Sequence, residues 1–311
     1  MMIPQISDAR IWEEFQQHSR TFSMATRFLP SEIRTPVATL YLYCRQIDNI
    51  ADELALTAGK EEALLALAEV EKNLAAIFEG KPPRHPFWER LAEIHQRYEL
   101  SSPPMFELIE GARWDLTDRL IANEDDLLAY ANLVAGSVGA MMLPFLAEEK
   151  EDRAILLPTA RALGNAMQLT NIIRDVGEDL KSLRRIYIPA TWMDEFEVMR
   201  SDLMGADIPS GYPLLMERLM QMAEERYIEG FKGIHRLPRR VRGGIRMAAR
   251  FYREIMNEVR RNGYNNLSKR AYVPKQRKMR LIIDNDYYRR RDAMLPKSMP
   301  NSVYPPIHSM T

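Results

Sequence analysis

Two pairs of aspartates are the residues of this chain whose types and spacing most clearly suggest chemistry. Asp48 and Asp52 form one pair, and Asp175 and Asp179 form the other. On a helix, residues four apart share a face with their Cβ atoms about 6 Å apart, so the two carboxylates of each pair repel each other. Because both surrounding stretches are apolar, this arrangement suggests that a cation binds at each pair.

A solvated helix face is the alternative explanation for this spacing. Glu89 and Glu93 have the same spacing, but their segment is rich in charge and Arg97 follows one turn later as a partner. Leucines stand at the corresponding position after both aspartate pairs. Taken together, the two pairs therefore favour a metal site over a solvated face.

Polar side chains extend each pair along the same helix face. Tyr41 and Arg45 precede the first pair at helical spacing, and Gln168 and Asn171 precede the second. Each row spans about 16 Å at a rise of 1.5 Å per residue, which is long enough to line a cavity. Two such walls facing each other would form an acidic cleft.

Paired carboxylates at helical spacing are suited to hard divalent cations. Mg²⁺ usually takes one or two protein carboxylates and completes its shell with water and substrate phosphate oxygens. The chain has no G-x-x-x-x-G-K-[ST] phosphate loop, so we expect a diphosphate bound through bridging Mg²⁺, with Mn²⁺ as the alternative ion. Basic residues near the pairs would add phosphate contacts: His18, Arg20, Arg45, Arg174, Lys181, Arg184 and Arg185.

Departure of a diphosphate would leave a carbocation. Metal ions and arginines at the leaving group stabilise the negative charge that it gains as the C–O bond breaks. An apolar tunnel would shield the cation from water, and Phe22, Tyr41 and Tyr130 are candidate π faces for it. Ordinary packing in the core is the equal alternative for the two tyrosines.

The composition sets limits on the class of protein. Acidic and basic residues balance at 43 each, which gives no overall electrostatic case for binding nucleic acid. Cys44 is the only cysteine, so no internal disulfide can form, and its apolar neighbours predict a buried thiol. The N-terminal residues lack the basic and apolar regions of a signal peptide, so we expect a cytoplasmic protein.

One uncharged segment, 127–147, is long enough to cross a bilayer. It contains Asn132, several small residues and Pro144. A helix that is apolar on all sides is commonly the central helix of a soluble bundle. We therefore expect 127–147 to be a buried central helix.

Helical periodicity dominates the chain, which predicts an all-α fold with one domain at 1–280 and a mobile or loosely packed tail at 281–311. Pro- and Gly-containing breaks between the helices are short, so no second domain is indicated. The expected helices are 7–17, 31–55, 60–79, 85–98, 103–122, 124–147, 151–181, 212–234 and 239–262.

The sequence from 18 to 279 resembles the squalene/phytoene synthase family of head-to-head prenyltransferases. The resemblance implies a helical isoprenoid synthase bundle around a central active-site cavity. Its second aspartate motif is the most specific, because eight motif residues stand in register between 168 and 189. The matching segments are HSRTF at 18–22, YLYCRQIDNIAD at 41–52, YANLVAGSVGAMMLPFL at 130–146, LGNAMQLTNIIRDVGEDLKSLRRIYIP at 163–189 and RAYVPKQRKM at 270–279.

The resemblance implies a role for each matched position. The four aspartates would bind Mg²⁺ together with Asn171, with Gln168 in the same pocket. Residues that would hold diphosphates or position the prenyl chains are His18, Ser19, Arg20, Thr21, Phe22, Tyr41, Arg45, Arg174 and Arg270. Tyr130, Ala135, Gly136 and Gly139 would line the tunnel, and Arg185 and Tyr187 would belong to a flap over the site.

Some of these positions have a second explanation or depart from the family. Gly136 and Gly139 could equally allow close packing of helices instead of lining a tunnel. His18 could equally form a hydrogen bond at a helix end instead of contacting phosphate. The family often has an acid where Asn49 stands in the first motif. The outer aspartates are kept, so we expect activity to survive.

The implied reaction is the condensation of two geranylgeranyl diphosphates to phytoene through prephytoene diphosphate, without a redox cofactor. One alternative is squalene or dehydrosqualene synthesis from farnesyl diphosphate, in which squalene would require NADPH. Another is a non-catalytic assembly or scaffold relative, against which the intact aspartate pairs argue. Because substrate and product are lipidic, we expect peripheral contact with the inner face of a membrane or with downstream carotenoid enzymes.

Overall fold

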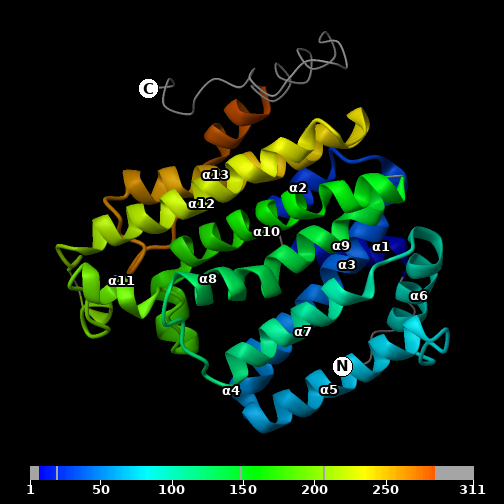
Figure 1. The fold of residues 1–311 in the computed structure, drawn as a ribbon, viewed down its shortest axis with the longest axis horizontal. Helices are drawn as coiled ribbons and strands as arrows, with labels where there is room; N and C mark the ends of the chain where they lie inside the picture. The colour runs from blue at the N-terminus through cyan, green and yellow to red at the C-terminus, as the bar shows by residue number, and fades with distance from the viewer. Residues whose placement is uncertain (1–6, 19, 148, 206, 284–311) are drawn as a thin grey trace.

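The structure is a computed structural model that describes residues 7–18, 20–147, 149–205 and 207–283, without the side chains of 18 and 20–22. Helices make up its regular structure and no strand occurs among these residues, which confirms the all-α prediction (Figure 1). The predicted site residues His18, Ser19, Arg20, Thr21 and Phe22 fall on positions whose side chains lie outside the described part.

The N-terminal half of the chain contributes helices that pack around α3 (Ser31–Asn49). Apolar residues on α3 recur every three or four positions, among them Ile33, Val37, Leu40 and Ile47, and all four are buried. α3 contacts helices before and after it in the chain. Its neighbours are α1 (Asp8–His18), α2 (Arg20–Thr26), α6 (Pro86–Tyr98), α7 (Ser102–Leu116) and α9 (Ser137–Leu146), while α5 (Lys60–Phe78) packs on α6 and α7.

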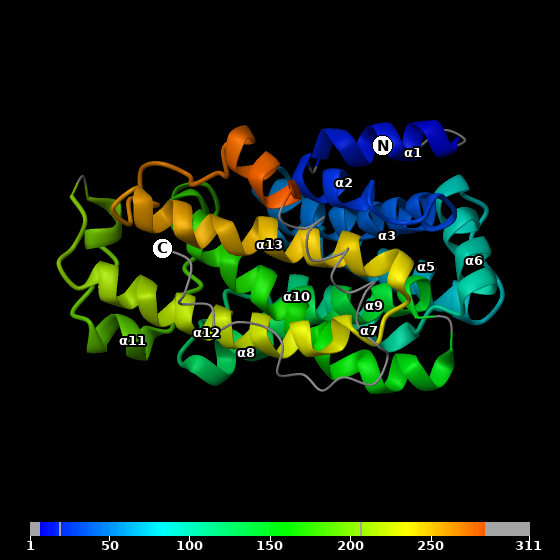
Figure 2. The same ribbon diagram turned by 90° about the horizontal axis from the view of Figure 1, so that it is seen from above.

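α10 (Lys150–Glu178) runs through the middle of the bundle (Figures 1 and 2). It packs on α9 on one side and on α12 (Tyr212–Ile234) and α13 (Arg239–Arg261) on the other. Glycine permits the close approach to its neighbours, because a Cβ at Gly164 would lie 2.1 Å from the carbonyl oxygen of Ala135. α10 therefore touches both halves of the molecule.

Two clusters of buried apolar side chains form the core. One gathers residues from α1, α3, α5, α6, α7 and α9, and the other gathers residues from α8 (Glu124–Ala131), α10, α11 (Ala190–Glu195), α12 and α13. Both clusters supply side chains to a single cavity. The helices thus hold the aspartate motifs on opposite walls of that cavity.

Three of the predicted long helices contain a π-helical turn. These turns are η1 (Ile50–Leu54), η2 (Asn132–Gly136) and η3 (Asp179–Leu183), and a three-residue helix, α4 (Ala55–Thr57), follows η1. A π-helix bonds each residue to the fifth one along, so side chains four apart are no longer placed as in an α-helix. In both aspartate motifs the second aspartate lies inside such a turn, which the helical period did not predict.

Other helix boundaries differ in ways that have a local cause. The helix predicted at 103–122 ends at Leu116, and Asp118 then adopts a positive φ of 53° that breaks the helical path. The short helices α2 and α11 and the 3₁₀ turn η4 (Asp202–Met204) were not predicted, because so few residues give no clear periodicity. Residues 275–283 are helical, and the remainder of the predicted tail, 284–311, lies outside the described residues.

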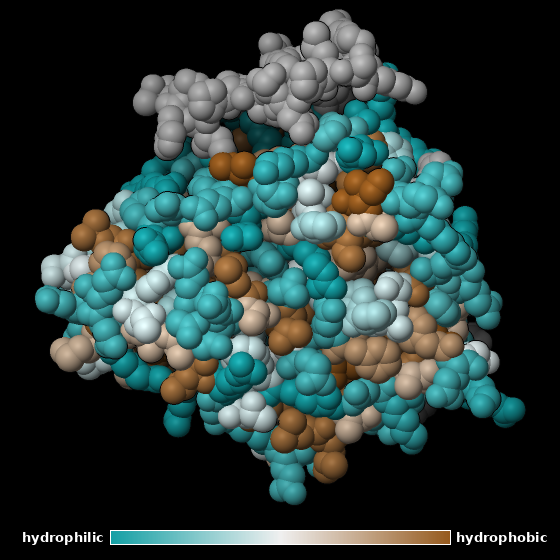
Figure 3. All heavy atoms as spheres, viewed as in Figure 1, coloured by the Kyte–Doolittle hydropathy of each residue, from teal (hydrophilic) through white to brown (hydrophobic). Residues whose placement is uncertain are grey.

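The uncharged segment forms α8, η2 and α9, and within the described residues 124–146 is long and apolar enough to cross a membrane. More than half of the relevant window is buried inside the bundle, between α7 and α10. That burial is the arrangement expected for a central core helix. On the face in Figure 3, hydrophobic residues are scattered among hydrophilic ones.

Candidate active site

A cavity of about 750 Å³ lies between α3, α7, α9, α10, α12 and α13. This volume is within the range of sites that enclose a small organic ligand. Its walls are acidic and basic at one end, where both aspartate motifs meet, and apolar at the other end. The apolar end includes Leu143, Leu146, Leu156, Ile234 and Leu237.

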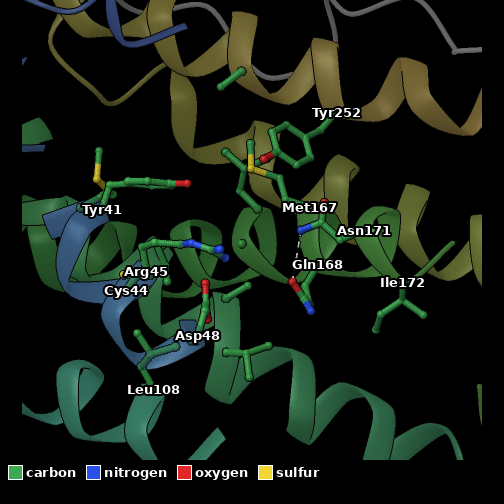
Figure 4. Close-up of a pocket in the computed structure, with 18 of the residues that line it drawn as sticks. Tyr41, Cys44, Arg45, Asp48, Leu108, Met167, Gln168, Asn171, Ile172 and Tyr252 are labelled. Carbon is green, nitrogen blue, oxygen red and sulfur yellow. Dashed lines mark hydrogen bonds between the residues drawn. The ribbon is translucent and has the colours of Figure 1, made fainter. Parts of the chain in front are cut away.

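The first wall comes from α3 and its π-helical extension. Tyr41, Arg45 and Asp48 line the cavity from successive turns of α3, and Asp52 follows from η1. Figure 4 shows the first three side chains directed into the space opposite α10. The row that was predicted from helical spacing therefore does line one wall.

The second wall comes from the C-terminal turns of α10 and from η3. Gln168, Asn171, Asp175 and Asp179 all line the cavity. Asn171 donates a hydrogen bond from Nδ2 to Gln168 Oε1 at 3.3 Å, which leaves the buried Asn171 Oδ1 without a protein partner (Figure 4). An unpaired buried amide oxygen next to carboxylates is a donor suited to a hard cation.

Arginine neutralises one aspartate of each pair. Arg185 donates from Nη1 to Asp52 Oδ1 at 2.6 Å, although 133 residues separate them in the chain. Asp175 accepts hydrogen bonds from Arg174 at 2.7 Å and forms an ion pair with Arg270 at 2.8 Å.

The other aspartate of each pair has no ion pair with any described residue. Burial and the neighbouring Asp52 raise the pKa of Asp48 to about 7, although its carboxylate remains open to the cavity. Burial, then Asp175 and Asp52, raise the pKa of Asp179 to about 8. Both aspartates line the same cavity, one from η1 and the other from η3.

The residues at the acidic end fit divalent metal ions. Four carboxylates and the free Asn171 oxygen are hard oxygen donors, and two of the carboxylates form no ion pair with a described residue. Within the described residues, no three acidic, histidine or cysteine side chains are grouped tightly enough to hold one ion by themselves. Mg²⁺ does not need such a group, because water and substrate phosphate complete its coordination.

A fifth aspartate, Asp115, lines the same cavity and was not predicted. It accepts a hydrogen bond from the phenol of Tyr130 and another from the phenol of Tyr187, both at 2.9 Å. Burial raises its pKa to about 6, while Arg185 and the two phenols act in the opposite direction. Tyr252 of α13 also lines the cavity and was not predicted (Figure 4).

Most of the other predicted site residues also line the cavity, namely Tyr130, Ala135, Gly139, Arg174, Tyr187 and Arg270. Arg185 reaches the site through its contacts with Asp52 and the carbonyl of Ala51, not by lining the cavity itself. Gly136 is buried away from the lining, where a Cβ would lie 2.4 Å from Asn132 Oδ1. Gly139 lines the cavity and also permits close packing, since a Cβ there would lie 2.1 Å from the carbonyl oxygen of Ala160.

The basic segment after the second motif has partners in this structure. Lys181 donates to the carbonyl of Leu267 at 2.7 Å, and Arg184 ends η3 with a positive φ of 59°. Arg185 is paired as described above. Distant parts of the chain therefore supply the acceptors for Lys181 and Arg185.

Cys44 also lines the cavity wall, and burial raises the pKa of its thiol well above the ordinary value. This agrees with the expectation of a buried thiol that is not reactive.

Comparison with known proteins shows which family the chain belongs to. Residues 15–277 match the family model described as squalene/phytoene synthase. The chain is 33% identical over 281 residues to phytoene synthase of Rhodobacter capsulatus, covering 90% of this chain and 81% of that protein. It is 32% identical over 284 residues to 15-cis-phytoene synthase of Synechococcus elongatus, covering 86% of this chain and 90% of that protein.

Solved structures give a consistent result. A dehydrosqualene synthase in complex with a ligand superposes with a TM-score of 0.82 and 32% identity, over 91% of this chain and 96% of that one. Squalene synthase HpnC from Alicyclobacillus acidocaldarius, at 24% identity, shares the fold with a TM-score of 0.72 over 83% of this chain and 95% of that one. With its paired aspartates on facing walls of one cavity, this chain belongs to the squalene/phytoene synthase family.

Proposed function

We propose that this protein is a prenyltransferase that condenses two geranylgeranyl diphosphates head-to-head to phytoene, through prephytoene diphosphate, releasing two diphosphates. The observation that carries the proposal is one cavity with both aspartate pairs at one end and apolar walls at the other. Two similar proteins bear the names phytoene synthase and 15-cis-phytoene synthase, which supports this substrate and product.

The acidic end would bind the diphosphates. Asp48, Asp52, Asp175 and Asp179, with Asn171 Oδ1, would hold Mg²⁺ or Mn²⁺, which would supply charge stabilisation to the departing diphosphate oxygens. The guanidinium groups nearby are suited to bidentate phosphate contacts. They are Arg45, Arg174 and Arg270, which all line the cavity.

The apolar end would hold the prenyl chains and exclude water from cationic intermediates. Leu156 and Asp175 both line the cavity from α10. Their separation of 19 positions corresponds to about 28 Å of helix at 1.5 Å per residue. Leucine and isoleucine side chains at that depth offer no nucleophile and no hydrogen bond, so the prenyl tails would pack there and keep water out of the cavity, while the cation forms at the diphosphate end.

A product analysis tests the proposal directly. The purified protein is incubated with Mg²⁺ and either geranylgeranyl or farnesyl diphosphate, with and without NADPH, and the hydrocarbon is identified by mass spectrometry. We expect phytoene from geranylgeranyl diphosphate and no requirement for NADPH. A C30 hydrocarbon formed from farnesyl diphosphate, with geranylgeranyl diphosphate left unused, would contradict the proposal.

Dehydrosqualene synthesis is the second candidate. It is favoured by the likeness to the solved dehydrosqualene synthase, whose identity of 32% equals that of one phytoene synthase relative. Squalene synthesis would differ in requiring NADPH. A non-catalytic assembly role would give no hydrocarbon from either substrate, so the same incubation distinguishes all the candidates.

We also propose that the protein works in the cytoplasm in peripheral contact with the inner face of a membrane. Residues 271–283 support this, because they follow Arg270 at the cavity and expose apolar Tyr272, Met279 and Ile283 beside basic Lys275 and Arg280. Apolar side chains next to basic ones suit the interface of an anionic bilayer. Contact there would let the lipidic product pass to the bilayer or to downstream carotenoid enzymes.

Vesicle flotation tests this contact. The protein should float with anionic vesicles at low salt, be released by high salt, and bind less when Lys275 and Arg280 are both changed to glutamate. A second test is carbonate extraction of membranes from cells that express the protein, which should release it. Protein that stays with the membranes would instead mean that 127–147 spans the bilayer.

A further inference from the structure

Asp115 occupies a position that protein stability alone does not favour. It is the penultimate residue of α7, where the helix dipole disfavours a negative charge. Its side chain is only 11% exposed. The nearest guanidinium nitrogen, Arg185 Nη1, lies 3.7 Å from Oδ2 and is already bonded to Asp52. Asp115 is thus a buried carboxylate whose nearest cation is shared with Asp52. This arrangement points to a function other than stabilising the fold.

Two phenols instead satisfy the carboxylate of Asp115. Tyr130 of α8 donates its proton to Oδ2, and Tyr187, which follows η3, donates to Oδ1. The two rings stack with centroids 4.8 Å apart, and both line the cavity. One carboxylate therefore joins three separate segments of the chain at the cavity wall.

The direction of these hydrogen bonds determines what the phenols offer to a ligand. A tyrosine hydroxyl has one proton to donate, whereas its oxygen can also accept. Because Asp115 accepts both protons, Tyr130 and Tyr187 present oxygen lone pairs and electron-rich rings to the cavity, and no proton donor. Such groups attract a cation.

We propose that Asp115 is a positioning residue that fixes Tyr130 and Tyr187 as acceptors toward the cavity, where they stabilise the cationic intermediate. The inference rests on the proposed function. When the C–O bond breaks, its electron pair leaves with the diphosphate and a carbocation remains. Capture by the double bond of the second substrate, followed by loss of a proton, gives prephytoene diphosphate, which goes on to hydrocarbon. Capture by water instead gives a prenyl alcohol and releases a proton to solvent. Loss of the Asp115 contacts should shift the outcome toward water.

Asp115→Asn tests this with little change in volume. The amide can accept through one oxygen only, so one phenol must lose its acceptor. We expect kcat for hydrocarbon formation to fall about 10- to 100-fold with KM changed by less than about threefold. Diphosphate released per hydrocarbon should rise above the wild-type value, with prenyl alcohol as the extra product. Asp118→Asn is the matched control, because Asp118 is exposed and lies just beyond α7, and its only ion pair among the described residues is with Lys60.

A double-mutant cycle separates positioning from a purely structural effect. If Asp115 acts through the two phenols, then Asp115→Asn should cause little further loss of activity in a protein that already carries Tyr130→Phe and Tyr187→Phe. Multiplicative losses would overturn the proposal. If Asp115→Asn does not fold, the two single variants Tyr130→Phe and Tyr187→Phe replace it. We expect each of them to raise the fraction of product that is prenyl alcohol. An unchanged fraction in both variants would overturn the proposal.

Tyrosine labelled with ¹³C at Cζ provides a readout that does not depend on turnover. The resonances of Tyr130 and Tyr187 should shift in Asp115→Asn and stay in place in Asp118→Asn. Unchanged resonances, or an unchanged diphosphate-to-hydrocarbon ratio with wild-type kcat, would overturn the proposal. If the wild-type protein forms no hydrocarbon, the proposed function itself fails, and the ¹³C shifts still report whether Asp115 controls the phenols.

Discussion

Replacing Asp179 by asparagine should make the metal-free protein more stable to heat at alkaline pH. Burial and the neighbouring carboxylates raise the pKa of Asp179 from 3.8 to about 8. The folded protein therefore keeps a proton between about pH 4 and pH 8 that the unfolded chain has released. Stability falls as the pH rises through this window, and Asp179→Asn removes that loss.

The size of the effect follows from the pKa shift and from the openness of the cavity. At 1.36 kcal/mol per unit, the full shift corresponds to about 5 to 6 kcal/mol. Asp179 is only partly covered, so solvent screening reduces this to about 2 kcal/mol. An unfolding entropy of about 2.1 cal/mol/K per residue gives about 0.65 kcal/mol/K for 311 residues. A gain of about 3 °C in Tm results.

Thermal melts in a chelator at pH 5 to 9 measure this gain. Asp179→Asn should melt about 3 °C above the wild type at pH 9, and the difference should shrink as the pH approaches 5. Asp207→Asn is the control, because Asp207 is an exposed carboxylate in the loop before α12. An Asp179→Asn protein that melts at or below the wild type at pH 9, or a gain that is independent of pH, would refute the account of the unpaired carboxylate.

Three further outcomes follow from the site. Asp48→Asn or Asp175→Asn should lower kcat more than about 100-fold at saturating Mg²⁺ with the fold retained by circular dichroism; near wild-type activity would show that the carboxylates are not ligands. Mg²⁺ with a thio-diphosphate analogue should protect the amides of 181–185 from hydrogen exchange, and much less so in Asp179→Asn; equal protection without metal would contradict this coupling. Gly139→Ala should destabilise by about 1 to 3 kcal/mol in denaturant melts, since the methyl meets a backbone carbonyl; an unchanged midpoint would show that α10 can move away.

Local spacing was sufficient to predict the two walls of the site. Tyr41, Arg45 and Asp48 lie on one α-helix, and so do Gln168 and Asn171, so the period of the helix alone places each row. Helical periodicity between Pro- and Gly-containing breaks likewise predicted every long helix among the described residues. These features depend on residues only a few positions apart, so the order of residues is enough to predict them.

Features that depend on distant contacts could not be predicted in this way. Asp115 stands in a charged stretch that looks like a solvated helix end, and its partners come from 15 and 72 residues away. Arg185 bonds to Asp52 across 133 residues, and no helical spacing connects them. The π-helical turns that contain the second aspartate of each motif carry no distinctive composition. Packing of α7 against η1 and η2 brings Asp115 and the π-helical turns together. The spacing of residues along one helix does not predict which helices pack against each other.

The central claim is that both aspartate pairs act together on one metal-bound diphosphate site. A crystal structure with Mn²⁺ and a thio-diphosphate analogue tests it most directly, because Mn²⁺ is located by its anomalous scattering. We predict Mn²⁺ peaks in contact with Asp48 or Asp52 and with Asp175 or Asp179, joined by oxygens of the analogue, in the same molecule. Analogue bound by arginines alone, or Mn²⁺ confined to one pair, would contradict the claim.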